Sequence, residues 1–131
     1  MQYSVDINNA RLDVVETTTG ASPKLRIFSG TAPANCAAAD SGTLLCEMTL
    51  PSDWMNAAAS AQKTLLGTWS GTASAGSAAT PTHFRIWNSG ATACKIQGTA
   101  GIASGELQVN GTITSGQTVT VTAFQLNAAN T

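Results

Sequence analysis

The chain has 131 residues, of which 43% are hydrophobic and only 10% charged, and its formal net charge at pH 7 is −1. This length predicts one domain spanning residues 1–131. Because the six basic residues are scattered among seven acidic ones, no patch can neutralise many phosphates, and we expect no binding to nucleic acid. Small uncharged residues replace the missing charges, which suits permanent packing against other chains because few long side chains must be immobilised at a contact.

The sequence lacks the signals of a membrane or secreted protein. No stretch approaches 18 consecutive apolar residues, so no membrane contact is expected. The start, MQYSVDINNARLD, has neither a basic nor an apolar segment, and no signal peptide is predicted. We therefore expect folding in the cytoplasm, where the thiols of Cys36, Cys46 and Cys94 meet a reducing environment.

Residues 1–20 are predicted to form an N-terminal arm or a short helix. Asn8 or Asn9 can cap a helix over residues 9–17, and Gly20 can end it. The β-branched residues that follow Leu12 favour extended chain instead. We adopt the helix as the prediction.

Two strands are predicted on either side of a loop of small residues. Residues 24–28 alternate, with Leu25 and Ile27 on one face and two basic residues on the other, as in a half-buried strand. Residues 43–50 alternate again and end at Pro51, which cannot donate to a central ladder. One face of this second strand is predicted to carry Leu44, Cys46, Met48 and Leu50.

The middle of the chain has weaker signals. Ser52 or Asp53 can cap a brief helix over residues 54–61, and residues 63–69 look extended, so that both pieces form a flap beside a sheet. Residues 70–82 are small and without period, and we predict a flexible surface loop there.

The last third of the chain alternates between strands and turns. Residues 83–97 form a predicted hairpin, and residues 106–109 and 117–126 form two further strands. In the final strand the apolar set changes face near Ala123. Either a β-bulge returns Phe124 and Leu126 to the core, or neighbours cover this end of the strand on both sides.

Seven or eight strands with glycine-rich turns predict the fold class. We expect an all-β domain, an antiparallel, jelly-roll-like β-sandwich with one or two short helices. Residues 1–20 and 70–82 are the predicted exceptions to the strand pattern.

No catalytic, cofactor or metal site is predicted. The spacing of the cysteines and His83 matches no zinc pattern. Cys46 is interpreted as a small buried residue, while a disulfide between Cys36 and Cys46 stays open. His83 is interpreted as a surface or interface side chain rather than a general base, since no orienting third group is marked. We therefore do not expect an enzyme or a bound cofactor.

The three tryptophans, Trp54, Trp69 and Trp87, allow two interpretations. Exposed together, they would form the flat stacking platform of a sugar-binding or adhesive module. Alternatively, Trp54 and Trp69 anchor the flap to the core or lie at a subunit interface. We favour the second interpretation.

Three stretches carry a resemblance that spans nearly the whole chain: LRIFSGTAPANCAAADSGTLLCEMTLPSDWM, HFRIWNSGATACKIQGTA and SGQTVTVTAFQL. They resemble a family of small β-rich virion structural proteins of tailed bacteriophages, encoded among capsid and connector genes. The features are a strand ending in an aromatic residue and Ser-Gly, a Pro-Ala loop, a GTLL strand and an FRI strand with a hairpin. They concern packing and turns, so no catalytic residue carries over.

The resemblance implies a capsid decoration or cement protein that binds the outside of the capsid and stabilises contacts between major capsid protein subunits. It implies a virion location after synthesis in the host cytoplasm. Closed trimers are a common arrangement for such proteins, so we expect a homotrimer. A tail or head–tail connector component is the alternative within the same class.

Cement proteins gain many weak contacts across a repeating surface, and we expect such contacts in residues 3–7, 31–42 and 54–77. Within the second of these segments, Pro33 is expected to fix the path of the loop and Cys36 to be unreactive. The candidate contact residues are Tyr3, Val5, Ile7, Pro33, Asn35, Asp40, Trp54, Met55 and Trp69.

Overall fold

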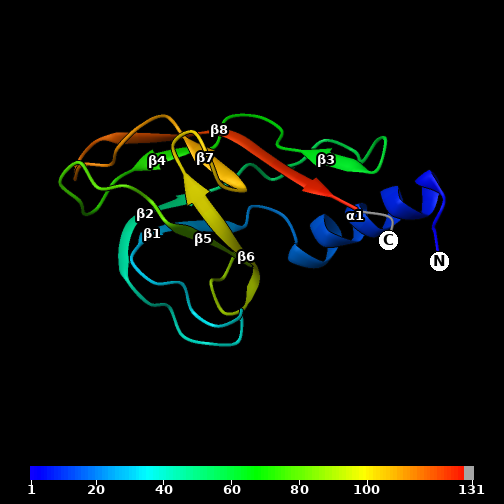
Figure 1. Cartoon of the computed structure of the whole chain (residues 1–131), viewed down its shortest axis with the longest axis horizontal. Coiled ribbons are helices and arrows are strands. Elements are labelled where there is room, and N and C mark those ends of the chain that lie inside the picture. The colour runs from blue at the N-terminus through cyan, green and yellow to red at the C-terminus, as the bar shows by residue number, and fades with distance from the viewer. Residues whose placement is uncertain (129–131) are drawn as a thin grey trace.

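A computed structural model describes residues 1–128 as one helix beside a curled sheet (Figure 1). The helix is α1 (Val5–Thr19). The strands are β1 (Lys24–Ser29), β2 (Thr43–Thr49), β3 (Gln62–Thr64), β4 (Ser70–Thr72), β5 (His83–Trp87), β6 (Cys94–Gly101), β7 (Leu107–Val109) and β8 (Thr118–Asn127).

The strand order explains the curl of the sheet. Neighbouring strands run β2-β1-β5-β6-β7-β8-β3, and β4 pairs with β8 off this path. All of these pairs are antiparallel except β6 with β7, which is parallel. An isolated bridge between Cys46 of β2 and Ala73, directly after β4, brings the far ends of the sheet together. The prediction of a β-rich, mostly antiparallel fold is confirmed.

Aromatic side chains fill the space inside the curl. Trp54 and Trp69 are fully buried, with ring centroids 5.8 Å apart, and Trp69 lies 5.1 Å from Phe124. Both indole nitrogens are satisfied, because Trp54 donates to the Gly20 carbonyl (3.1 Å) and Trp69 to that of Leu66 (3.2 Å). The interpretation of these two tryptophans as core anchors is confirmed.

A helix is confirmed over residues 9–17, but it begins earlier, at Val5 with Ser4 as its N-cap, so the predicted caps Asn8 and Asn9 are wrong. The helix ends at Gly20, whose φ of 91° suits glycine and whose N–H donates to the Glu16 carbonyl at 2.9 Å. The buried ammonium of Lys63 joins the helix to β3 by ion pairs with Asp13 (2.7 Å) and Glu16 (2.8 Å). A polar clamp therefore positions α1 against the sheet.

The helix predicted over residues 54–61 is wrong. A two-residue turn at Ser60 and Ala61, both with positive φ, lies between Ala59 and Gln62, which exchange two backbone hydrogen bonds of 2.9 Å. Backbone amides in this segment pair with side chains of α1: Ala58 N–H with Asp13 (3.0 Å) and Ala61 N–H with Asn9 (2.9 Å). These tertiary bonds take the place of the bonds that a local helix would have made.

The segment 70–82, predicted as a flexible loop, begins with strand β4 and is bonded along its length. Ala73 is buried and bridges Cys46, and Ala79 exchanges two 2.8 Å backbone hydrogen bonds with Ile113. Gly71 explains why small residues occur here, since an added Cβ would lie 2.8 Å from the Cβ of Met48. Small side chains let β4 lie directly against β2.

Two bulges adjust which side chains reach the core. In β8, Gln108 faces Ala123 and Val109 faces Val121, so Thr122 is the extra residue. The bulge predicted near Ala123 is thereby confirmed: Phe124 is buried and Leu126 packs against the core.

In β2 the register skips Leu45, which is buried beside Cys46, whereas Leu44 is only half-buried. Simple alternation had placed Leu44 on the core face.

The hairpin predicted over residues 83–97 is confirmed as β5 and β6. Its two strands place His83, Arg85 and Gln97 on the face of the sheet opposite to Phe84 and Ile86, which belong to the core. That opposite face lies under the loop of residues 30–42.

Candidate functional site

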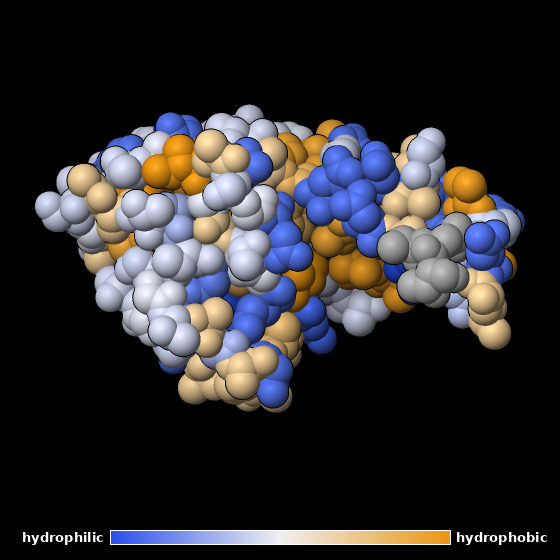
Figure 2. All heavy atoms as spheres, in the orientation of Figure 1, coloured by the Kyte–Doolittle hydropathy of each residue, from blue (hydrophilic) through white to orange (hydrophobic). Residues whose placement is uncertain are grey.

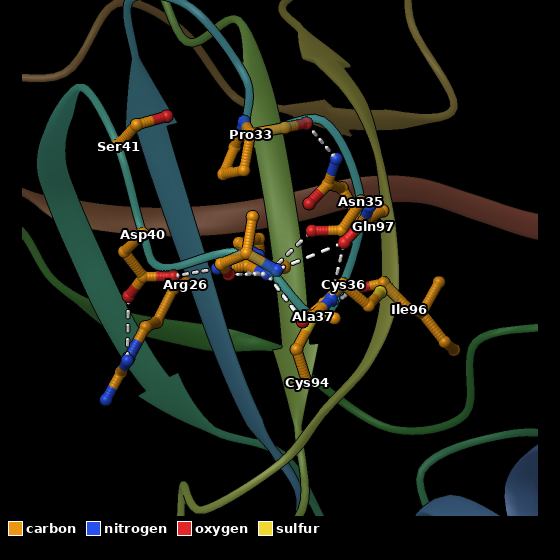
Figure 3. Close-up of polar contacts among 12 residues, drawn as sticks. Arg26, Pro33, Asn35, Cys36, Ala37, Asp40, Ser41, Cys94, Ile96 and Gln97 are labelled. Carbon is orange, nitrogen blue, oxygen red and sulfur yellow. Dashed lines mark hydrogen bonds and ion pairs between the residues drawn. The ribbon is translucent and has the colours of Figure 1, made fainter.

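The loop of residues 30–42, named here the covering loop, lies over the outer face of β1, β5 and β6 (Figure 3). Under it, His83 is 2% exposed and Arg85 is fully buried. The interpretation of His83 as a surface or interface side chain is wrong, because the covering loop of the same chain buries a face that alternation alone assigns to solvent.

Arg85 holds the covering loop through four contacts. Its Nη1 donates to the carboxylate of Asp40, and its Nη2 donates to the carbonyls of Asn35 (3.3 Å), Cys36 (2.9 Å) and Ala38 (2.9 Å). A buried guanidinium is tolerated only when its charge and its donors are matched in this way. Arg85 therefore fixes the path of the loop from below.

Asp40 also binds a second arginine. Its other oxygen accepts a 2.8 Å bond from Arg26, which donates through Nε to Glu47 at 2.6 Å. Both guanidinium carbons lie near the ring of Trp87, 4.9 Å away for Arg26 and 5.1 Å for Arg85, within cation–π range. Charge in this region is thus paired within the chain.

Further hydrogen bonds anchor the first residues of the covering loop and join its two ends. Gln97 donates to the Pro33 carbonyl at 2.7 Å, and Thr82 donates to the Gly30 carbonyl at 2.6 Å. Within the loop, the hydroxyl of Ser41 donates to the Thr31 carbonyl at 2.7 Å. The loop is therefore a shaped and bonded connection.

His83 is packed rather than poised for proton transfer. Its ring stacks on Phe28 with centroids 4.9 Å apart and planes 2° from parallel, and Nδ1 lies 3.1 Å from the Thr82 hydroxyl. Burial lowers the pKa of His83, although the carbonyls of Gly30 and Ser41 act in the opposite direction. The imidazole is therefore covered by the loop and packed against an aromatic ring.

Four buried polar atoms on this face have no hydrogen-bond partner within residues 1–128: His83 Nε2, Arg85 Nε, Trp87 Nε1 and Gln97 Oε1. All four belong to β5 and β6 under or beside the covering loop. Buried polar atoms are usually paired, so these four atoms mark unused hydrogen-bonding capacity under and beside the covering loop.

The structure separates the nine predicted contact residues into three groups. Tyr3, Val5 and Ile7 are exposed at 44%, 55% and 47%. Pro33, Asn35 and Asp40 belong to the covering loop, where Asn35 accepts two amide bonds from Ala37 and Ala38 and Asp40 pairs with arginines. Trp54, Met55 and Trp69 are at most 1% exposed, so they offer no surface for a partner.

The tryptophans do not form a common platform. Trp54 and Trp69 lie inside the sheet, while Trp87 is half-buried on the opposite face beside two guanidinium groups. A stacking surface for a sugar ring would therefore have to rest on Trp87 alone.

The three cysteines are free and lie in two places. Cys46 is fully buried, as predicted, and burial raises the pKa of its thiol to about 11. Cys36 lies on the covering loop, and its thiol neighbours that of Cys94 at the start of β6. The disulfide considered between Cys36 and Cys46 is absent from the structure, since Cys46 faces the core.

Sequence reasoning missed Arg85 as the organising residue of this face. The pattern HFRIW places Arg85 beside His83 and Trp87, but it gives no sign that a distant loop covers them. The one available signal was the scarcity of charge, which makes a pair such as Arg85 and Asp40 conspicuous in a chain with only 10% charged residues.

Among residues 1–128, no three His, Cys, Asp or Glu side chains are grouped so that they could hold a metal ion. In the same part of the chain, no helix has the length and apolar character needed to cross a membrane. No protein family model, no curated protein and no solved structure matches this chain.

Proposed function

We propose that this protein is a non-enzymatic structural component of a tailed-phage virion, a cement protein that binds the outside of the capsid and stabilises contacts between major capsid protein subunits. The observation that carries the proposal is a row of exposed apolar side chains on α1 and on the segment just before it. Tyr3, Ile7 and Val14 are exposed at 44%, 47% and 59%.

Ile7 and Val14 lie on one side of α1, because they are two helical turns apart. Tyr3 lies before the helix, and its ring packs under the Arg11 guanidinium at 5.1 Å. The docked side of the helix is different, because Asn8, Leu12 and Thr19 are its buried residues. The apolar row therefore points away from the body of the protein.

Exposed apolar groups of this kind favour association. Figure 2 shows hydrophobic residues at the surface of the end of the molecule where α1 lies. Large exposed apolar side chains gathered on one side of a helix are a feature of interaction sites. The few charges elsewhere and a net charge of −1 keep electrostatic repulsion between neighbouring copies small.

A cement role fits such a surface because many copies act together. Each copy gains a modest contact through α1, and a trimer multiplies that contact by holding several helices against one repeating lattice. The trimer and the jelly-roll-like sandwich are part of this proposal. The covering loop, in which Asn35 is exposed and Pro33 half-buried, is the second contact candidate.

A tail or head–tail connector component is the alternative that the same apolar row supports. A sugar-binding module is less favoured, because two of the three tryptophans are buried. Enzymatic activity is not part of the proposal, since His83 is covered and the Asp40 carboxylate is paired with two arginines.

The proposal is tested by binding to capsids that lack the protein. Purified Ile7→Asp is sedimented with such capsids and compared with the native chain and with Thr112→Asp, which adds the same charge at an exposed site away from α1. Asp near a helix N-terminus is compatible with the helix. We expect Ile7→Asp to bind about 10- to 100-fold more weakly, from the burial of one large apolar side chain.

Equal binding of the native chain and both variants would contradict the assignment of α1 as the contact. Failure of the native chain to bind any capsid would contradict the cement role itself.

A further inference from the structure

We propose that Cys36 and Cys94 are a disulfide-forming pair, through which a disulfide-type oxidant fastens the covering loop to β6. This inference goes beyond the proposed function and does not depend on capsid binding. It replaces the expectation that Cys36 is unreactive.

The two cysteines share one place in the fold. Both line a cleft of about 590 Å³ whose other walls include the alanines of the covering loop and Trp87. Figure 3 draws both residues where the covering loop passes β6. Each is only half-buried, so a small reagent in the cleft can reach either sulfur.

Arg85 holds the pair in position. Its Nη2 donates to the Cys36 carbonyl at 2.9 Å. On the neighbouring strand, Cys94 pairs with Trp87, which follows Arg85 by two residues along β5. The loop backbone at Cys36 is therefore fixed against the same hairpin that carries Cys94. Closing the bond requires side-chain adjustment at a site whose backbone is already anchored.

The chemistry of the two thiols sets the order of steps. Burial raises the pKa of Cys94 to about 11, the neighbouring Cys36 thiol acts in the same direction, and the Arg85 guanidinium opposes both. Because the thiolate is the attacking form, Cys94 reacts slowly at neutral pH. Bond formation is then faster under mildly alkaline conditions.

Oxidised glutathione is a suitable oxidant. The Cys36 thiolate attacks one sulfur of glutathione disulfide, forming a mixed disulfide and expelling one glutathione thiolate. The Cys94 thiolate then attacks the Cys36 sulfur, which forms the Cys36–Cys94 bond and expels the second glutathione thiolate. The two cysteines lose two electrons and two protons, and glutathione disulfide is reduced to two thiols.

Cys46 cannot take part in this exchange. It is fully buried on the core face, where its Sγ lies 3.6 Å from the Thr72 carbonyl. It therefore provides an internal control in every measurement.

The test treats the full chain with oxidised glutathione at mildly alkaline pH, blocks the remaining thiols after unfolding, and maps the peptides by mass spectrometry. We expect an intact mass lower by two hydrogens, a linked Cys36–Cys94 peptide and a free Cys46. The melting temperature should rise by roughly 5 to 15 °C, as expected for closing a long covalent loop.

Variants separate the pair from nonspecific oxidation. Cys46→Ala should form the same bond, whereas Cys36→Ser and Cys94→Ser should each keep glutathione attached or stay reduced. The proposal is overturned if the native chain keeps glutathione on both cysteines, links Cys36 to Cys46, or forms only dimers between chains.

Discussion

Arg85 on β5 and Asp40 on the covering loop are 45 residues apart in the chain, and their side chains form the ion pair that holds the loop over the sheet. Arg85 is fully buried, whereas the side chain of Asp40 is 28% exposed. The covering loop is thus held in place by a buried charge on β5, which the sequence of the loop itself does not reveal.

Removing Asp40 should destabilise the fold measurably. In Asp40→Ala the buried Arg85 guanidinium loses its carboxylate partner. We expect the free energy of unfolding to fall by about 3 kcal/mol, the low end of the range for breaking a buried ion pair, because water reaches the Asp40 side chain. Urea unfolding measures the loss. Glu47→Gln is the control: Glu47 pairs with Arg26 at a more exposed position, and its loss should cost less than about 1 kcal/mol. Equal effects of the two substitutions would contradict the role given to Arg85.

The clamp between α1 and β3 should fail at both extremes of pH. A hydrogen bond from Lys63 is the main cause that lowers the pKa of Asp13 below 3.8. The Asp13 carboxylate therefore stabilises the folded state above pH 3.8, and this stabilisation is lost as the pH falls through the lowered pKa. Burial works against the charge of Lys63, but the hydrogen bonds to Asp13 and Glu16 prevail and raise its pKa above 10.5. The Lys63 ammonium therefore stabilises the folded state below pH 10.5, and this stabilisation is lost as the pH rises through the raised pKa of Lys63.

Hydrogen exchange of residues 5–19 as a function of pH, corrected for the intrinsic rates, measures this clamp. We expect protection across the neutral range and loss of protection at both ends. Lys63→Met should exchange faster than the native chain at neutral pH, because Asp13 and Glu16 lose their shared partner. Unchanged protection in Lys63→Met would show that α1 is held by other contacts.

The close approach of β4 to β2 should make Gly71 intolerant of a side chain. In Gly71→Ala the new methyl lies 2.8 Å from the Cβ of Met48 and 3.3 Å from the sulfur of Cys46, so we expect a loss of about 1 to 3 kcal/mol. Gly111→Ala is the matched control, since nothing lies within 4 Å of its added Cβ and it should change stability by less than about 1 kcal/mol. Thermal unfolding distinguishes the two, and equal melting temperatures would refute the close packing.

Local patterns in the sequence were sufficient for most strands and for the bulge in β8. Alternation identified β1, β2 and the β5–β6 hairpin, and the change of apolar face near Ala123 indicated the extra residue at Thr122. These features depend on neighbours along the chain, which is why they can be predicted from periodicity.

Features that depend on distant contacts were not predictable. The amides of Ala58 and Ala61 bind side chains of α1, which replaced the helix expected there by a turn. The covering loop buried His83 and Arg85 on a face that alternation assigns to solvent. Likewise, the exposure of Tyr3, Val5 and Ile7 fits their expected role as contacts, but the burial of Trp54, Met55 and Trp69 was set by the curl of the sheet.

The most direct test of the cement proposal is electron cryomicroscopy of virions from the producing cells, with the position of this chain determined in the density. The account predicts copies bound over the capsid lattice, with Ile7 and Val14 of α1 and the preceding Tyr3 facing the major capsid protein. Density for the chain only at the neck or tail, or its absence from the particles, would contradict that account.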